Sequence, residues 1–494
     1  MSTYTAIQYL LDDYPRTLFP LSTTKVIAEN RGKEVLEYVY QKVLNKTENE
    51  HCFLSQARCY ASKQGFHLRR TVKLDPVAEL FIYDIIYRNR NLFRKDFNQN
   101  RRSFGYRFEH GKPLSATKSY AEFKAALAHA KSTYKYALKF DVATYFNSLY
   151  HHYIVKWFSE IGAPVDDVEY LGQFLRQANT GVSIDCLPQG LHPCKIIGAE
   201  FLKFIDNSVR LRCSLMLRFM DDFYLFSDDE NVLIGDFLMV QRLLGEKGLS
   251  LNSTKTIIGQ VSDLDVAKKV DEIKAGLLKI RRTMVKAYGE TLKFEEEEYY
   301  EKLSSEEVEY LLNLLKNPDI DESDAELVLV LLREHGTDVL ERMDTFLERF
   351  PSLSRSVYHF SSRVDDVEAL ASLIFNFIKN GNNITEDQLF WMAKLAEDYL
   401  SGTSHYSAIL IELYEHKNAT LISRAKILEI PEQRFGMVEL REEHLRTGKS
   451  DWLAWAAAVG SGGATAISRN HTLSYFSNAS PMNKIIGDCI TNLS

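Results

Sequence analysis

The feature that most constrains this chain is a pair of adjacent acids, Asp221 and Asp222, inside a largely apolar run. The residues on both sides of the pair, from Ser214 to Ser227, are mostly apolar, as in two paired strands joined by a tight turn. Such strands bury their apolar side chains, while the charged pair stays at the turn. The sequence therefore predicts a β-hairpin that carries two carboxylates at its tip.

A third acid, Asp141, ends a predicted strand that begins at Tyr136. Apolar residues then recur at four-residue spacing from Leu149 to Ile161, which indicates a helix directly after this strand. A second helix is predicted at Pro193, because proline suits the first helical turn. This alternation of short strands and helices is typical of an α/β or α+β unit, with Asp141 at a strand end.

Beyond about residue 270 the strand signals end, and amphipathic helices follow one another along the rest of the sequence. Ser304 with Glu307, and Thr385 with Gln388, form capping boxes just before apolar helical patterns. Such helices recur roughly every 20 residues, which is typical of stacked antiparallel pairs in a solenoid. We therefore expect an all-α C-terminal domain.

The charge of the chain is unevenly distributed. The net charge is -7, yet residues 51–150 carry 18 Lys and Arg against 7 Asp and Glu. Residues 261–494 carry 26 Lys and Arg against 39 Asp and Glu. Since phosphate binding needs clustered cations, the first segment suits nucleotides or nucleic acid, and the second suits a protein partner.

The cellular location is predicted from what the sequence lacks. Its start has no secretory type of leader, and no stretch reaches the ~18 apolar residues that cross a bilayer. The six cysteines form no CxxC pair and show no zinc-finger spacing. We therefore expect a cytoplasmic protein with reduced cysteines and no membrane partner.

Acids at a strand end and at a neighbouring hairpin tip suit nucleotidyl transfer. This reaction uses two Mg²⁺ ions about 4 Å apart, which neutralise charge on the attacking and leaving oxygens. Such hard cations prefer carboxylate oxygens, and Mn²⁺ can take the place of Mg²⁺. We therefore expect Asp141, Asp221 and Asp222 to converge on two metal ions, although a single acid at a turn is commonly just solvated.

Four ordered motifs between residues 136 and 256 resemble those of the reverse transcriptase family. They are LKFDVATYFNSL around Asp141, LPQG at 187–190, RFMDDF at 218–223 and GLSLNSTKT at 248–256. The third motif has Phe where the family usually has Tyr. The resemblance implies an α+β fold of reverse-transcriptase fingers and palm, followed by an all-α, HEAT-like helical domain.

The expected domain boundaries follow from this resemblance. A fingers-like region would cover 1–130, a palm would cover 131–268, and the α-helical domain would cover 269–494.

The resemblance also implies roles for residues in the motifs. Asp141 and Asp221 would be the principal metal ligands, and Asp222 would support them. Lys255 matches the lysine that the family places near the triphosphate, where an ammonium group could stabilise or protonate pyrophosphate.

Other residues are expected to bind the incoming dNTP. Phe146, five residues after the first acid, matches the family's steric gate, which excludes a ribose 2′-OH; the alternative is a core aromatic. Gln189 would contact the nucleotide or its pairing base, or would be a polar turn residue. In the basic segment Arg69, Arg70 and Lys73 lie close together and could bind the triphosphate, or could be surface charges.

The chain departs from the family in having no thumb motif after the fourth motif and in carrying a long acidic helical tail. In this it resembles the abortive-infection (Abi) reverse transcriptases of bacteria, of the AbiK and prophage-encoded kind. That resemblance implies DNA synthesis without a template, started on a tyrosine hydroxyl of the protein, so that DNA stays covalently attached and phage propagation stops. A homo-oligomer and a phage-encoded trigger are further expectations.

Tyrosines before the palm, for example Tyr38, Tyr40 and Tyr60, could supply the priming hydroxyl, although packing is the usual role of such a residue and the sequence does not identify the primer. Two alternatives to this function stay open. A template-dependent RNA-directed DNA polymerase of retron or group II intron type would require an added template and primer. A catalytically silent palm used as a scaffold would be indifferent to Asp221→Ala.

Overall fold

The computed structural model of the protein describes residues 4–45, 51–93, 98–181, 187–265, 272–287, 303–434 and 436–492. By their internal contacts the residues form two compact units. The first, here called the sheet unit, consists of Met1–Leu18, Gly32–Gln56 and Leu74–Lys268. The second, the helical unit, consists of Phe19–Arg31, Ala57–Lys73 and Lys269–Ser494.

These units do not follow the boundaries expected from the sequence. Residues 19–31 and 57–73 lie in the expected fingers-like region, but their contacts group them with the helical unit. Helix α2 (Ser22–Tyr38) crosses from one unit to the other, and Arg31, with φ -135° and ψ 15°, interrupts its helical geometry at that point. The other expected division, between 268 and 269, coincides with a division between the units.

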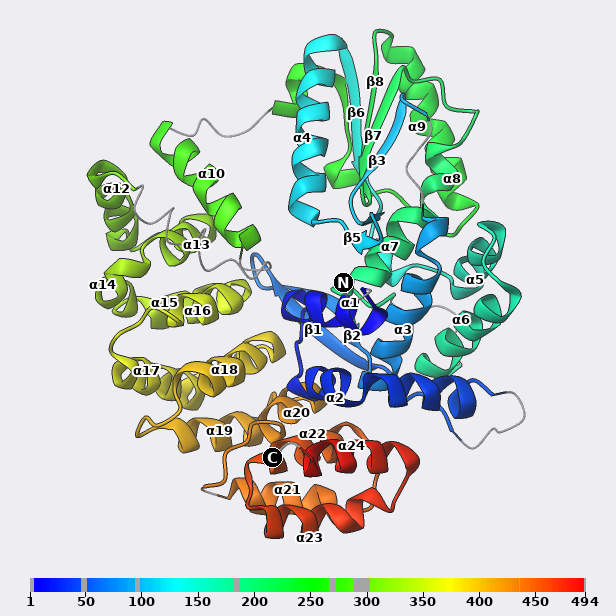
Figure 1. The fold of residues 1–494 in the computed structure, drawn as a ribbon. Coiled ribbons are helices and arrows are strands. Elements are labelled where there is room, and N and C mark those ends of the chain that lie inside the picture. Colours follow the sequence, from blue (N-terminus) through cyan, green and yellow to red (C-terminus); the bar gives the residue numbers. More distant parts are fainter. Residues whose placement is uncertain are drawn as a thin grey trace. The chain divides into compact units, whose positions relative to one another are not determined.

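The sheet unit is built on a five-stranded sheet with the order β3-β7-β8-β6-β9 (Figure 1). Strand β3 pairs parallel with β7, and all other pairs are antiparallel. The strands are β3 (Arg101–Phe104), β6 (Tyr136–Asp141), β7 (Leu215–Phe219), β8 (Asp222–Ser227) and β9 (Ile257–Gln260). The predicted strand ending at Asp141 and the predicted hairpin are thus both confirmed.

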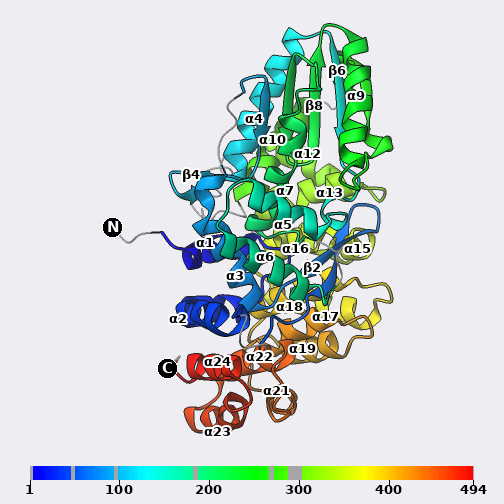
Figure 2. The same ribbon diagram turned by 90° about the vertical axis from the view of Figure 1, so that its right-hand side faces the viewer.

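Helices cover both faces of this sheet. Helix α4 (Ala116–Thr133) lies on one side and α9 (Glu230–Gly245) on the other (Figure 2). Phe123 and Leu127 of α4 pack in one buried cluster with Leu217 of β7. The remaining helices are α1 (Ala6–Asp13), α3 (Pro76–Arg88), α5 (His151–Glu160), α6 (Val165–Ala178), α7 (His192–Phe201) and α8 (Lys203–Asp206). Of these, α5 and α7 are the two helices predicted from the sequence.

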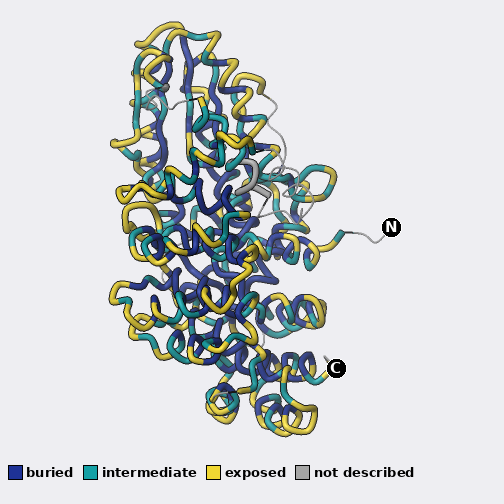
Figure 3. The backbone as a smooth tube through the Cα atoms, turned by 90° about the vertical axis from the view of Figure 1, so that its left-hand side faces the viewer, coloured by how far each residue is buried: buried dark blue, intermediate teal, exposed yellow. Residues whose placement is uncertain are grey.

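The helical unit stacks its helices in two rows (Figure 1). Contacts join α13, α16, α18, α20, α22 and α24 in one row, and α15, α17 and α19 in the other. Both predicted capping boxes are present, at the start of α12 and of α18, and Figure 3 shows buried and exposed positions alternating along the helices. Within this unit the fold expectation of an all-α C-terminal region is confirmed.

The bounds of these helices are α10 (Glu272–Ala287), α12 (Ser305–Lys316), α13 (Glu322–Leu331), α14 (Gly336–Leu340), α15 (Met343–Arg349), α16 (Ser354–Ser361), α17 (Val367–Asn380), α18 (Glu386–Tyr399), α19 (Tyr406–Glu415), α20 (Leu421–Leu428), α21 (Met437–Leu445), α22 (Trp452–Gly460), α23 (Ala466–Ser477) and α24 (Pro481–Thr491). Among the described helices, none combines the length and the apolar character that a membrane crossing requires.

A β-hairpin of β1 (Ala57–Lys63) and β2 (His67–Lys73) also belongs to the helical unit. The first turn of α18 binds its edge: Glu386 accepts a hydrogen bond from the backbone N–H of Tyr60 at 2.9 Å, and Asp387 accepts one from Ser62 at 3.3 Å. Carboxylates therefore satisfy edge N–H groups that would otherwise be open to another strand.

Candidate active site

Two acids meet where β6 and β8 run side by side. Asp141 is the last residue of β6, Asp222 is the first of β8, and the two are paired directly across the antiparallel strands. Residues opposed in this way project to the same face of the sheet. Below them the rings of Phe140 and Phe223 stack with centroids 4.8 Å apart, so a buried aromatic pair fixes the two strand ends.

The third acid lies in the turn of the hairpin. Phe219 and Asp222 form the last pair of β7 and β8, so Met220 and Asp221 make a two-residue loop. Met220 has φ 56°, in the left-handed region that non-glycine residues seldom adopt, and short hairpin loops require that conformation at their first position. Asp221 is therefore held on a tight loop rather than on a mobile one.

Lys255 reaches the acids from the segment before β9. Its ammonium group donates to Asp141 Oδ2 at 2.9 Å, although 64% of the lysine side chain is exposed. Asn252 anchors the segment, because its backbone N–H donates to the Asp141 carbonyl at 3.0 Å and its side chain caps the turn at Thr254. The fourth sequence motif is thus attached to the strand that carries the first.

The acids repel one another. Burial, together with the charges of Asp222 and Asp141, raises the pKa of Asp221 to about 6. Burial, followed by the charge of Asp141, also raises the pKa of Asp222. The hydrogen bond to Asp141 raises the pKa of Lys255. The site therefore concentrates negative charge that a cation would neutralise.

The carboxylate oxygens of this site are the kind of donor that a divalent metal ion requires. Asp141 Oδ1 is buried, and no described residue forms a hydrogen bond with it. The described residues do not form a closed group of three His, Cys, Asp or Glu around one point. Mg²⁺ is usually held by one or two carboxylates and by substrate phosphates rather than by a full protein cage. Asp141, Asp222 and the loop acid fit that pattern.

Phe146 and Gln189 lie in the same unit as the acids. Phe146 is in a short 3₁₀ turn after β6, is 7% exposed, and packs on α7 at Gly198, where an added Cβ would come within 3.0 Å of its ring. Its carbonyl accepts a hydrogen bond from Leu187 N–H at 2.9 Å. Gln189 follows in a half-buried turn before α7. The first and second sequence motifs therefore lie side by side.

Three expected triphosphate ligands belong to the other unit of the chain. Arg69, Arg70 and Lys73 are on β2, which belongs to the helical unit. Arg69 is exposed, Arg70 is half-buried, and Lys73 is buried at 4% exposure. Their role in binding the triphosphate stays a prediction.

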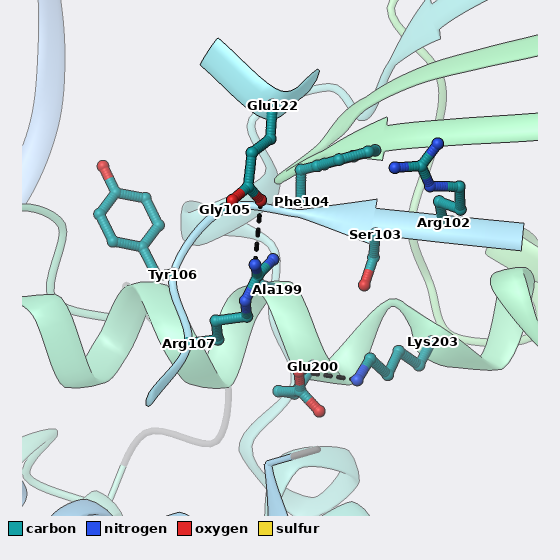
Figure 4. Close-up of a pocket in the computed structure, with 10 residues that line it drawn as sticks. All are labelled: Arg102, Ser103, Phe104, Gly105, Tyr106, Arg107, Glu122, Ala199, Glu200 and Lys203. Atoms are coloured by element: carbon teal, nitrogen blue, oxygen red, sulfur yellow. Dashed lines mark hydrogen bonds and ion pairs between the residues drawn. The ribbon is translucent and has the colours of Figure 1, made fainter. Parts of the chain in front are cut away.

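A polar cavity of about 180 Å³ opens at the end of β3 (Figure 4). Its lining includes two ion pairs, Arg107 with Glu122 at 3.0 Å and Lys203 with Glu200 at 2.9 Å. Gly105, also in its wall, faces Met220, because an added Cβ there would lie 3.5 Å from the methionine sulfur. The cavity is thus adjacent to the loop that holds the third acid.

The sequence did not indicate two buried residues below the loop. Arg218 on β7 and Asp206 at the end of α8 form an ion pair with almost no exposure. A charged residue in the middle of an apolar strand was the available signal, because such a residue must find a partner when it is buried.

Part of the chain matches a known protein family. Residues 89–311 match the family described as reverse transcriptase (RNA-dependent DNA polymerase). A search of curated proteins found no match.

Among solved structures, two Candida telomerases in complex with a TWJ fragment of telomeric RNA resemble the chain. The C. albicans protein is 12% identical with a TM-score of 0.31, and the match covers 73% of this chain and 65% of that chain. The C. tropicalis protein is 13% identical with a TM-score of 0.32, and the match covers 74% of this chain and 64% of that chain.

The apo telomerase of C. tropicalis is 13% identical with a TM-score of 0.32, over 87% of this chain and 73% of that chain. This chain therefore spans about two thirds of the RNA-bound telomerases, and similarities this weak assign neither activity nor partner to it. The family match and the paired acids agree: residues 89–311 match a reverse transcriptase domain, and this part of the chain carries the pair Asp141 and Asp222.

Proposed function

We propose that this protein is a DNA polymerase of reverse transcriptase type that needs no added template, primes synthesis on one of its own tyrosines, and acts in bacterial abortive-infection defence. The observation that carries the polymerase chemistry is the direct pairing of Asp141 with Asp222 beside Asp221. When bound, two Mg²⁺ or Mn²⁺ ions would supply charge neutralisation at the attacking and leaving oxygens. Asp141, Asp221 and Asp222 would hold them.

The substrate of this reaction would be a dNTP. Lys255 would place its ammonium group near the leaving pyrophosphate, where it can stabilise charge or supply a proton. Phe146, immobilised against α7, would crowd a ribose 2′-OH, and Gln189 would contact the base or sugar. Arg69, Arg70 and Lys73 remain proposed triphosphate ligands.

The distribution of charge supports synthesis without a duplex. An enzyme that follows a long template–primer duplex uses a continuous basic path to bind phosphates. Residues 261–494 instead have 39 Asp and Glu against 26 Lys and Arg. We therefore propose that the helical unit binds protein, either a second copy of the chain or a phage-encoded trigger, and does not bind a nucleic-acid duplex.

The test is incubation of the full chain with Mg²⁺ and each dNTP separately, without nucleic acid. We expect a mobility shift on a denaturing protein gel and an added mass that nuclease removes. Asp141→Asn should abolish the shift. A single unmodified mass in the isolated protein and after every incubation would contradict self-priming.

Three tyrosines can be compared as primers. Tyr60 is 43% exposed, whereas the Tyr40 hydroxyl donates to Asp84 at 2.7 Å and burial raises the pKa of Tyr38 to about 12. Tyr60→Phe is therefore the first substitution to make, with Tyr38→Phe and Tyr40→Phe as matched controls. Loss of attached DNA in the first variant alone would identify the primer.

The second candidate function is template-dependent synthesis of retron or group II intron type. The basic surplus of residues 51–150, with 18 Lys and Arg against 7 Asp and Glu, favours it. It predicts no product from dNTPs alone and extension of an added RNA-templated primer.

A further inference from the structure

Arg218 joins the catalytic hairpin to the helices beneath it. Its Nε donates to both carboxylate oxygens of Asp206, at 2.8 and 3.1 Å, and its Nη2 bonds the same carboxylate. The remaining arm, Nη1, donates to the carbonyl oxygen of Met220 at 2.9 Å. One guanidinium therefore connects the end of α8 to the loop that carries Asp221.

This arginine lies on the face of the sheet away from the acids. Asp222 pairs with Phe219, while Arg218 pairs with Phe223, and neighbouring residues of a strand point to opposite faces. The guanidinium lies over the ring of Phe223, 5.5 Å from its centroid, and is 0% exposed. Arg218 can therefore act on a bound ion only through the backbone of the loop.

Stability alone does not account for this pair. A buried ion pair must first overcome the cost of removing both charges from water, and apolar residues of similar volume often serve equally well. Met220, by contrast, holds a left-handed conformation (φ 56°) that a non-glycine side chain disfavours, and the hydrogen bond to its carbonyl helps to hold it there. Arg218 donates that hydrogen bond in a rigid, forked geometry that lysine lacks.

We propose that Arg218, fixed by Asp206, is a positioning residue that holds the Met220–Asp221 loop and so sets the place of the Asp221 carboxylate for a divalent cation. Gly105, whose φ is 123°, lies next to the same loop, because an added Cβ there would be 3.5 Å from the Met220 sulfur. The inference rests on the proposed polymerase chemistry for its purpose, but the loop geometry can be tested without synthesis.

The experiment titrates the full chain with Mn²⁺ alone and measures free Mn²⁺ by electron paramagnetic resonance. Arg218→Lys keeps the charge but cannot bind Asp206 and the loop carbonyl together, so we expect about 10-fold weaker Mn²⁺ binding. The double variant Asp206→Leu with Arg218→Met removes both charges and keeps the volume. We expect this double variant to unfold close to the wild-type temperature and to bind Mn²⁺ as weakly as Arg218→Lys does.

The matched control is Arg441→Lys. Arg441 is 2% exposed and also donates to backbone carbonyls, those of Leu428 at 2.9 Å and Glu432 at 2.6 Å, but in the helical unit. It should lower the unfolding temperature and leave Mn²⁺ binding unchanged. A folded double variant that binds Mn²⁺ within twofold of wild type would overturn the inference.

A second measurement separates this inference from the proposed function. If wild-type protein incorporates dNTP, Arg218→Lys should lower kcat about 10-fold and leave KM for dNTP within twofold, because the dNTP contacts are untouched. A 10-fold rise in KM with kcat unchanged would instead contradict a positioning role for Arg218. If wild type incorporates nothing, the polymerase proposal fails, and the Mn²⁺ result still decides the role of Arg218.

Discussion

The two units use buried carboxylates in opposite ways. In the helical unit Glu429 is 2% exposed and accepts hydrogen bonds from the backbone N–H groups of Ser22 and Thr23, each at 2.8 Å, while Lys426 balances its charge at 2.7 Å. In the sheet unit Asp141 Oδ1 is just as inaccessible, but no described residue forms a hydrogen bond with it. One carboxylate is saturated, and the other keeps a free coordination position.

The difference shows where the molecule gives up stability. A buried carboxylate that accepts N–H bonds and meets a cation stabilises the fold, whereas clustered acids without enough donors oppose it. Residues that break the rules of good packing concentrate at functional sites. The four predictions below test this contrast, starting with the largest expected effect.

Asp221→Asn should lower the rate of dNTP incorporation by about 10³-fold, or about 4 kcal/mol, because a metal ligand is lost. At pH values above 6, the unfolding temperature of this variant should equal or exceed that of wild type. Burial raises the pKa of Asp221 to about 6, so above that pH the substitution removes a negative charge that repels the neighbouring acids. Incorporation assays and thermal unfolding measure the two effects. Asp229→Asn, an exposed helix cap in the same unit, is the control and should change neither.

Glu429→Ala should have the opposite profile. It removes the acceptor for the start of α2 and takes from Lys426, itself fully buried, one of its carboxylate partners, while the pair of Lys426 with Glu397 remains. We expect a loss of about 3 kcal/mol in the free energy of unfolding, measured in urea. Glu442→Ala breaks an exposed pair with Arg446 and should cost less than about 1 kcal/mol. Equal losses in the two variants would remove the contrast.

Lys255→Gln should affect chemistry and leave the fold intact. The lysine side chain is 64% exposed, so its pair with Asp141 contributes little to stability, but its ammonium group is placed to assist pyrophosphate departure. We expect incorporation to fall about 10²-fold with no change in unfolding temperature. Lys156→Gln, an exposed lysine on α5, provides the comparison. A large drop in stability would argue that Lys255 is structural.

The smallest effect concerns Asp387 and pH. Burial raises the pKa of Asp387 to about 7, so between its ordinary value and pH 7 the folded state binds a proton that the unfolded state lacks. The contribution of this group to the free energy of unfolding therefore decreases as the pH rises towards 7, and it is constant above pH 7. Asp387→Asn should remove that pH dependence. At pH 8 its free energy of unfolding should exceed that of wild type by on the order of 1 kcal/mol. Parallel pH curves for the two proteins would contradict this, and Asp319→Asn, an exposed acid, is the control.

Local patterns were sufficient to predict much of the fold. The hairpin around Asp221, the strand ending at Asp141 and the capping boxes at Ser304 and Thr385 each depend on residues close together in the sequence. The match of residues 89–311 to the reverse transcriptase family agrees with the four ordered motifs between residues 136 and 256.

Long-range pairing was beyond such patterns. Strand β3 joins the sheet by parallel pairing with β7, more than 100 residues later, and the β1–β2 hairpin packs on helices over 300 residues away. The Arg218–Asp206 pair was missed although its members are only 12 residues apart, because only the folded chain places the end of α8 beneath β7.

The interleaving of the two units has a consequence for biosynthesis. Residues 19–31 and 57–73 leave the ribosome long before the helices with which they pack, since Glu429 and Glu386 are translated hundreds of codons later. Until then the N–H groups of the β1 edge lack their carboxylate acceptors, so we expect this edge to be open to other strands while the chain is being synthesised. For the same reason a fragment cut after residue 268 would lose the acceptors of that edge, so the sheet unit is better studied in the intact protein.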